Sequence, residues 1–228
     1  YYKPYFGDDV LIEEATQLAD MKDIVKHIKQ YMEIADYDAV NLETQLATQT
    51  PKEKAPKSVV FYTNPDILAA LEWAGIDYVS LGNNHTYDYL DSGLETTLAA
   101  LKKSNLGYSG AGKDEKQALQ AFEQNIKQQP FSMFGYVGWE GSARPNQTAG
   151  TNKGGAAFGS SKNIVDSVTS AANKKRHSIV QYHGSQEYAD EPTGVTEQRL
   201  KTAIDNGASL AIAHHPHVAQ GLELYKDQ

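Results

Sequence analysis

Short apolar segments alternate with helical patterns along this chain, and this alternation restricts its fold more than any other feature. Segments with the length and the branched or aromatic content of buried strands are expected at residues 39–40, 76–81, 131–137, 178–182 and 209–213. Helices are expected over residues 13–34, 64–75, 92–103, 115–126, 161–174 and 195–205. Strand–helix alternation of this kind builds sheets covered by helices, so we expect a single α/β domain over residues 1–228.

Two polar stretches interrupt the alternation. Residues 48–58 are rich in Lys, Pro and Thr, which predicts an exposed loop. Residues 138–159 are rich in Gly, Asn and Thr and predict a long loop near a site.

The charge and the lack of cysteine limit the chemistry. The formal net charge of −8 repels phosphate backbones, so we expect no nucleic-acid partner. An anionic substrate would need a local cation to hold it, either a metal or an Arg/Lys cluster. Because the chain has no cysteine, thiolate catalysis, disulfides and zinc–thiolate sites are excluded.

Histidines follow the last two predicted strands. The final strand continues into His214-His215-Pro216-His217, and the strand before it continues into His183. In extended chain, residues two apart point the same way, so His215 and His217 would face one side. His214 would point to the other side and is expected to be a packing or hydrogen-bonding neighbour.

Two earlier strands end in amides and carboxylates. Those strand ends supply Asn41, Glu43, Asn83, Asn84, His85 and Asp88. Ligands of open α/β sheets collect beyond the carboxyl ends of strands, so all four clusters fall where a site is expected. Nitrogen and oxygen donors of this kind suit borderline metals such as Zn²⁺, Mn²⁺ or iron.

Each cluster also has a structural explanation. The asparagines before His85 can form a turn that caps a helix, and Asp88 can simply orient His85. An exposed Glu43 is the commonest outcome for a glutamate. Three histidines within four residues are harder to explain by packing, since protonated imidazoles repel and a shared cation removes that repulsion.

Taken in order, these motifs resemble the signatures of the CapA-type capsule and poly-γ-glutamate biosynthesis family, PGA_cap. The matching motifs are Asn41-Leu42-Glu43, residues 80–85 with Asp88, His183-Gly184 followed by Glu187-Tyr188, and residues 214–218. The resemblance covers residues 36–225. That family is similar to the calcineurin-like metallophosphatases, so it implies a four-layer sandwich of two β-sheets flanked by helices, with a two-metal site.

The resemblance also implies a role for each motif residue. The residues implied as metal ligands are Asn84, His183, His215, His217 and Glu43. Those implied as catalytic are His85, as a histidine that supports the ligands or donates a proton, and Asp88. Those implied to line the site are Asn41, Asn83, His214 and Glu187.

The chain departs from the family pattern near both ends. The family opens with a strand ending in Gly-Asp, whose aspartate is the first metal ligand. Here the candidate is Gly7-Asp8-Asp9, which no apolar strand precedes and which is typical of a surface turn. We therefore expect the first strand and first ligand to lie before Tyr1, and the closing strand to lie beyond this sequence.

The function that the resemblance implies is capsule or poly-γ-glutamate biosynthesis or anchoring. A complete centre with two divalent metals (Mn, Zn or Fe) would support hydrolysis of the phosphoester type, with His85 protonating the leaving oxygen. The alternative is a non-catalytic scaffold that binds the anionic polymer or capsule synthase membrane subunits. A peptide-bond hydrolase acting on that polymer is a third, weaker alternative. The expected location is the extracellular face of the bacterial membrane, through an anchor outside this sequence.

Overall fold

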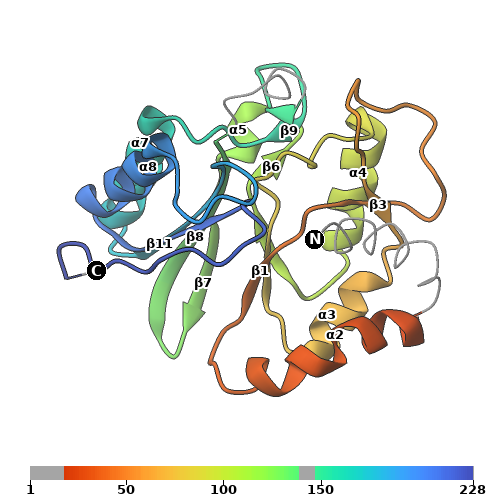
Figure 1. The fold of residues 1–228 in the computed structure, drawn as a ribbon, viewed down its shortest axis with the longest axis horizontal. Helices are drawn as coiled ribbons and strands as arrows, with labels where there is room; N and C mark the ends of the chain where they lie inside the picture. Colours follow the sequence, from red (N-terminus) through yellow and green to blue (C-terminus); the bar gives the residue numbers. More distant parts are fainter. Residues whose placement is uncertain (1–17, 139–146, 228) are drawn as a thin grey trace.

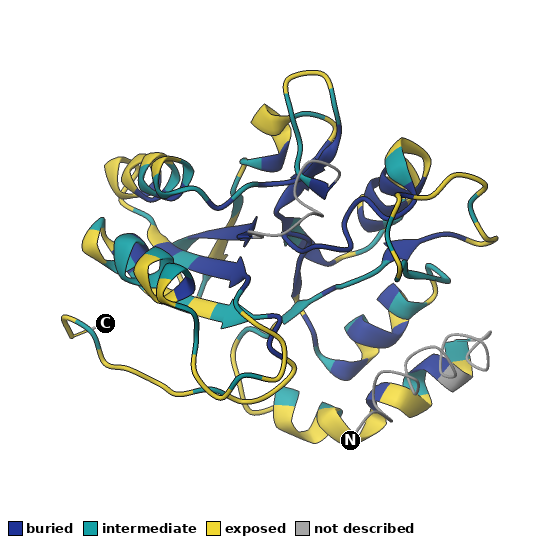
Figure 2. Cartoon of the chain, turned by 45° about the horizontal axis from the view of Figure 1, so that its top comes forward, coloured by how far each residue is buried: buried dark blue, intermediate teal, exposed yellow. Residues whose placement is uncertain are grey.

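A computed structural model describes residues 18–138 and 147–227 of the chain. Within them, two β-sheets lie next to each other, and each carries its own helices (Figure 1). The inner strands of both sheets are mostly buried, while the outer faces of the helices are exposed (Figure 2). The predicted α/β class with two sheets flanked by helices is confirmed, and its regular four-layer stacking stays a prediction.

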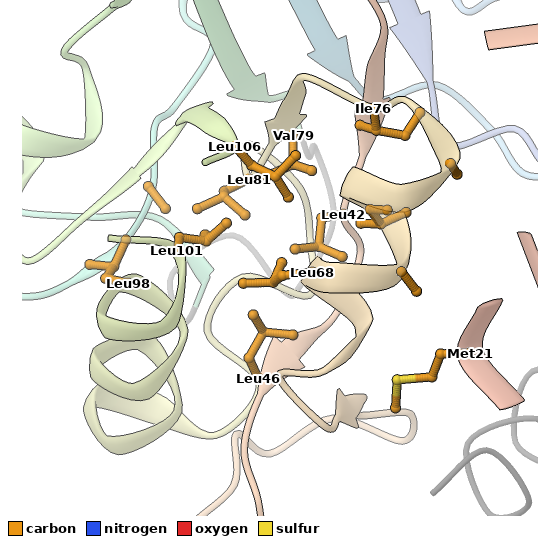
Figure 3. Close-up of a cluster of buried hydrophobic side chains, with 14 of the residues drawn as sticks. Met21, Leu42, Leu46, Leu68, Ile76, Val79, Leu81, Leu98, Leu101 and Leu106 are labelled. Carbon is orange, nitrogen blue, oxygen red and sulfur yellow. The ribbon is translucent and has the colours of Figure 1, made fainter. Parts of the chain in front are cut away.

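The first sheet contains three parallel strands in the order β1–β4–β5. These strands are β1 (Ala39–Asn41), β4 (Tyr78–Ser80) and β5 (Gly107–Ser109). The helices that share its core are α2 (Leu18–Met32), α3 (Ile67–Ala74) and α4 (Leu90–Leu101). Leu46, Leu68 and Leu101 are among the leucines that fill this core (Figure 3). As predicted, α3 ends at Gly75, whose φ of 98° is the left-handed conformation that closes a helix.

The second sheet contains four strands in the order β11–β10–β8–β7. These strands are β7 (Phe122–Ile126), β8 (Gln129–Val137), β10 (His177–His183) and β11 (Ala208–His214). β10 is parallel to both of its neighbours, and β7 pairs antiparallel with β8. The helices on this sheet are α7 (Ser161–Asn173) and α8 (Gly194–Asp205). Ser160 and Thr193 cap them by accepting hydrogen bonds from backbone N–H groups at their first turns.

Several short elements were not expected from the sequence. They are the parallel pair β2 (Gln45–Leu46) and β3 (Tyr62–Thr63), and the antiparallel pair β6 (Ala111–Gly112) and β9 (Gly155–Ala156). β5 was not expected either. Strands of two or three residues are too short to show a period in the sequence. Among the helices that the described residues form, none has both the length and the apolar character needed to cross a bilayer.

The helix predicted over residues 115–126 is wrong beyond Ala118. Helix α5 (Glu115–Ala118) is one turn long, and residues 122–126 form the strand β7. Lys127 and Gln128 have positive φ values of 45° and 69°, which is the conformation of a two-residue hairpin turn between β7 and β8. Neither residue is the Gly or Asn that marks such turns in sequences, and the apolar residues around them have a helical spacing.

Two glycines set how closely the sheets approach. A Cβ atom added to Gly82, just after β4, would lie 2.3 Å from the Tyr136 nitrogen of β8. One added to Gly135 would lie 2.4 Å from the Ser80 hydroxyl oxygen. Contacts this close leave no room for a side chain. The carboxyl end of β4 is therefore held against the second sheet, beside the carboxyl end of β10.

Candidate metal centre

The four strand ends singled out in the sequence meet at one place. Asn41 ends β1, and His183 and His214 end the neighbouring strands β10 and β11, where they are paired in register. The loop after β4 brings Asn84 to His183, 99 residues further along the chain. The structure thus brings together residues from both sheets, as the rule for strand ends predicts.

Two groups of side chains could donate lone pairs to a metal ion, and we call them the first and second donor groups. The first consists of Glu43, His183 and His215, whose candidate ligand atoms all lie within 4.8 Å of one another. His183 Nε2 is 3.3 Å from Glu43 Oε1 and 2.8 Å from Asn84 Oδ1. Ions such as Zn²⁺ hold nitrogen and oxygen ligands at about 2.0–2.2 Å, which puts neighbouring ligand atoms about 3 Å apart. Lone pairs that face each other at these distances need a proton or a metal between them. The donor set therefore fits a divalent cation.

The orientation of His183 depends on His214. The Nδ1 atoms of the two rings are 2.9 Å apart, so one of them donates a hydrogen bond to the other. Burial, followed by the charge of His183, lowers the pKa of His214 to about 3, so His214 is neutral near pH 7. With His214 as the acceptor, His183 donates from Nδ1 and turns the lone pair of Nε2 to the donor group. Metal-binding histidines are usually oriented by such a partner.

Glu43 is held as a carboxylate by two asparagines. Asn41 Nδ2 donates to Glu43 Oε2 at 3.0 Å, and Asn83 Nδ2 donates to Asn41 Oδ1 at 3.0 Å. Burial acts to raise the pKa of Glu43, but its contact with His183 and the nearby His85 and His215 outweigh burial and lower it. The result is a pKa of about 2, so Glu43 carries a negative charge at neutral pH.

A second donor group consists of Glu187, His215 and His217, again within 4.8 Å of one another. His215 Nε2 is 3.9 Å from Glu187 Oε1. His215 is buried, whereas Glu187 and His217 are exposed. The two groups share His215, and His217 belongs to the second rather than to the set around His183. Two adjacent groups of this kind suit two cations, and the number bound stays a prediction.

The backbone around His215 differs from the extended chain that was predicted. β11 ends at His214, and the φ values of His215 and His217 are 111° and 59°. The two imidazoles therefore meet through a turn, and the alternation of a strand does not apply to them. Residues other than glycine seldom adopt such φ values, which cost about 1–3 kcal/mol each and cluster at functional sites. Tyr188 N–H holds the turn by donating to Pro216 O at 2.7 Å.

His85 is fixed by Asp88 on the side away from the donor groups. His85 Nδ1 is 2.6 Å from Asp88 Oδ2, and the Phe61 ring lies against the imidazole with its centroid 4.3 Å away. His85 Nε2 is turned toward Glu43, 3.9 Å from its Oε1. Asn83 acts as the turn-forming residue that the structural explanation predicted: its Oδ1 accepts a hydrogen bond from the His85 backbone N–H.

Sequence reasoning missed two residues that contact Asp88. Lys57 Nζ donates to Asp88 Oδ1 at 2.6 Å, and Gln147 Nε2 approaches the same oxygen at 3.4 Å. The exposed loop predicted over 48–58 is therefore only partly correct: Lys54 is exposed, but the Lys57 side chain is only 12% exposed. Nothing in the sequence separates Lys57 from the other lysines of that stretch. Gln147 does fall in the loop that was expected near a site.

A cavity of about 450 Å³ opens beside the first donor group. It is lined by Asn41, Glu43 and residues 213–220. Among these lining residues there is no Lys or Arg. An anionic ligand in this cavity would depend on a bound cation for its counter-charge. The candidate first ligand, Asp8, lies outside the residues that the structure describes.

Comparison with known proteins gives a consistent picture. The model of the bacterial capsule synthesis protein family PGA_cap matches residues 5–228. The capsule biosynthesis protein CapA of Bacillus anthracis is 26% identical over 209 residues, which cover 89% of this chain and 50% of that protein. The PGA biosynthesis protein CapA of Bacillus subtilis (strain 168) is 25% identical over 227 residues, which cover 97% and 58%. The chain thus spans about half the length of these curated relatives.

Among solved structures, a hypothetical protein from Thermus thermophilus has a similar fold. It superposes with a TM-score of 0.51 and 12% sequence identity, over 87% of this chain and 64% of that one. At this identity the likeness concerns the fold alone.

Proposed function

The chain belongs to the PGA_cap family of bacterial capsule synthesis proteins, and on that premise we propose that it serves capsule or poly-γ-glutamate synthesis as a divalent-metal-dependent hydrolase of the phosphoester type. We further propose that it works at the extracellular face of the bacterial membrane, anchored there, beside capsule synthase membrane subunits. Its substrate would be a phosphoester, and the anionic polymer would be a binding partner.

One observation carries the proposal: the convergence of Glu43 Oε1, Asn84 Oδ1 and His183 Nε2, with His215 beside them. These candidate metal ligands lie at or just after the ends of β1, β4, β10 and β11, and they meet there although they are far apart in sequence. Glu43 Oε1 and Asn84 Oδ1 are both acceptors and both lie close to His183 Nε2, which is how oxygen and nitrogen ligands are arranged around a shared cation. Mixed nitrogen and oxygen donors suit Mn²⁺, Zn²⁺ or iron.

Each residue of the centre then has a defined task. Glu43, Asn84, His183 and His215 would hold the cation, which when bound supplies Lewis-acid polarisation and counter-charge for a phosphoryl group. The cavity next to them would admit the substrate. His85 presents Nε2 toward this space while Asp88 holds Nδ1, and that geometry suits transfer of a proton between Nε2 and the leaving oxygen.

A second candidate is a non-catalytic scaffold. It is favoured by the names of the two curated relatives, which describe biosynthesis of a capsule and of PGA. The same cation would then bind carboxylates of the polymer, and the exposed second donor group around Glu187 and His217 would extend that contact.

Two assays separate the candidates. The full chain, loaded with Mn²⁺ or Zn²⁺, is tested for hydrolysis of a phosphomonoester and a phosphodiester, and calorimetry measures its binding to poly-γ-glutamate. The variants are His215→Ala and, as a control, His27→Gln on the exposed face of α2. We expect metal-dependent turnover that His215→Ala loses and His27→Gln retains. If neither ester is hydrolysed while the polymer binds in a metal-dependent way, the hydrolase is excluded and the scaffold is favoured.

A further inference from the structure

Lys57 is placed unlike the other lysines of its loop. Its ammonium group lies 2.6 Å from Asp88 Oδ1, 2.6 Å from the backbone oxygen of Asn84 and 3.3 Å from His85 Nδ1. Its side chain is 12% exposed, and that of Asp88 is fully buried. Lys52 and Lys54, a few residues earlier, are exposed.

Asp88 accepts hydrogen bonds on both of its oxygens. Oδ2 accepts from His85 Nδ1 at 2.6 Å and from the Phe61 backbone N–H at 2.8 Å. Oδ1 accepts from Lys57 and, at 3.4 Å, faces Gln147 Nε2. A fully buried carboxylate stays ionised only when a counter-charge and hydrogen-bond donors compensate for the lost water. Within the described residues, the basic side chain that contacts this carboxylate besides His85 is Lys57.

The charge on Asp88 decides which nitrogen of His85 carries the proton. An ionised Asp88 can only accept, so Nδ1 must donate to it and Nε2 keeps its lone pair for the site. A neutral Asp88 could donate its own O–H to Nδ1, and the imidazole proton would then sit on Nε2. Lys57 Nζ lies 3.3 Å from His85 Nδ1, whereas Asp88 Oδ2 lies 2.6 Å from it, so the carboxylate is the nearer partner of Nδ1.

We propose that Lys57 is a positioning residue: by donating to Asp88 Oδ1 it holds the carboxylate in place as the acceptor for His85 Nδ1–H, and thereby fixes the tautomer of His85 that turns Nε2 to the donor group. The proposal deepens the proposed function, on which it rests for the use of His85 at the site. The hydrogen bond from Lys57 to the Asn84 backbone oxygen adds a second effect, because it ties the same ammonium to the loop that carries His85.

The test compares Lys57→Met with Lys54→Met, which removes an exposed lysine of the same loop. Nitrogen-15 spectra of the histidine side chains are recorded on the full chain in EDTA at one neutral pH, and His85→Gln identifies the signals of His85. We expect a protonated Nδ1 and an unprotonated Nε2 in the wild type and in Lys54→Met. In Lys57→Met we expect the His85 signals to move to the other tautomer or to an average of the two.

Restoring the charge supplies a second arm. Lys57→Ala leaves space for a propylammonium ion, which should restore the wild-type His85 signals, while neutral propanol should not. If Lys57→Met does not fold, the proposal is tested by two other measurements of the His85 signals. These are their recovery with propylammonium in Lys57→Ala and their positions in Lys57→Arg, which keeps the positive charge. The proposal is overturned if folded Lys57→Met keeps the wild-type tautomer, or if propanol restores the signals as well as propylammonium does.

The spectroscopic result does not depend on turnover, so it stands even if the protein hydrolyses no ester. Where hydrolysis is found, we expect Lys57→Met to lower kcat about 10- to 100-fold with KM nearly unchanged, the size typical of a lost supporting contact. A rise in KM at constant kcat would show instead that Lys57 binds substrate.

Discussion

Two neighbouring polar clusters of this molecule satisfy their hydrogen bonds in different ways. In the Asp88 cluster (Lys57, Phe61, His85, Asp88 and Gln147), donors from distant segments surround one carboxylate. In the histidine rim (His183, His214, His215 and His217), nitrogen atoms gather beside Glu43, and two residues adopt left-handed φ values. His214 Nε2 is buried there with no hydrogen-bond partner among the described residues.

The difference indicates separate roles. The Asp88 cluster is completed by the protein itself and can hold its geometry without a ligand. The histidine rim lies beside the Glu43 carboxylate, which can only accept, and together they are arranged to receive a cation. A functional site needs ligands that are held in place by rigid neighbouring residues. Here the Asp88 cluster is the rigid support, and the histidine rim supplies the ligands.

The largest effect is expected from Asp88→Asn. This change removes the carboxylate that compensates Lys57 and accepts from His85, and breaking a buried ion pair from one side costs about 3–5 kcal/mol. The free energy of unfolding, measured with urea in EDTA, should fall by that amount. Asp66→Asn, at an exposed position, should change it by less than about 0.5 kcal/mol. A loss below about 1 kcal/mol for Asp88→Asn would contradict the role given to the cluster.

The next effect concerns the histidine rim and its cation. A ligand that binds only the folded state stabilises it by about 2.7 kcal/mol when the ligand concentration is a hundred times its Kd. Adding Mn²⁺ or Zn²⁺ to the EDTA-treated protein should therefore raise Tm in the wild type and in His27→Gln. The rise should disappear in His183→Gln, which removes a nitrogen from the first donor group. An equal rise in His183→Gln would place the cation elsewhere.

The rim should also make the metal-free protein acid-sensitive. Burial, together with the charge of His183, lowers the pKa of His214 to about 3 and that of His215 to about 4, from an ordinary 6.5. Below pH 6.5 these two histidines bind protons in the unfolded chain but not in the folded protein. The free energy of unfolding therefore falls as the pH drops toward 4. The slope is about 1.4 kcal/mol per pH unit for each histidine.

His215→Gln should remove the share of that slope that belongs to His215. Urea unfolding in EDTA between pH 4.5 and 7 measures it. Glu43, with its pKa of about 2, stays ionised in the folded protein throughout this range, so it contributes to the slope only toward pH 4.5, where the unfolded glutamate takes up a proton. A slope identical in wild type and variant would show that His215 accepts a proton as readily in the folded protein as in the unfolded one.

The smallest effect is expected from Glu187→Gln, which alters the second donor group only. The Glu187 side chain is 45% exposed, so stability should change by less than about 0.5 kcal/mol. Calorimetric titration with Mn²⁺ should keep its tighter binding event and lose only a weaker one. Loss of the tighter event would mean that the two groups do not bind separately.

Much of this arrangement is readable in the sequence, for a physical reason. Strands β8, β10 and β11 are seven to nine residues long and apolar, so their ends at Val137, His183 and His214 are visible as changes from apolar to polar. Once parallel strands are assumed, the polar residues after them must gather at one edge.

The rest of the site depends on tertiary contacts, which leave no local pattern in the sequence. Lys57 belongs to a lysine-rich loop, and only the tertiary fold buries it against Asp88. The turn at His215 follows from hydrogen bonds made by Gly184 and Tyr188, which lie about thirty residues earlier. The hairpin at Lys127 was missed because its turn lacks the glycine or asparagine that usually marks one.

That Glu43, His183 and His215 hold a divalent cation is tested most directly by anomalous diffraction from crystals of the full chain soaked in Mn²⁺. We predict an anomalous peak within bonding distance of Glu43 Oε1, His183 Nε2 and a nitrogen of His215, and its loss in His183→Gln. Crystals that show manganese at other positions but none between these three side chains would contradict that assignment.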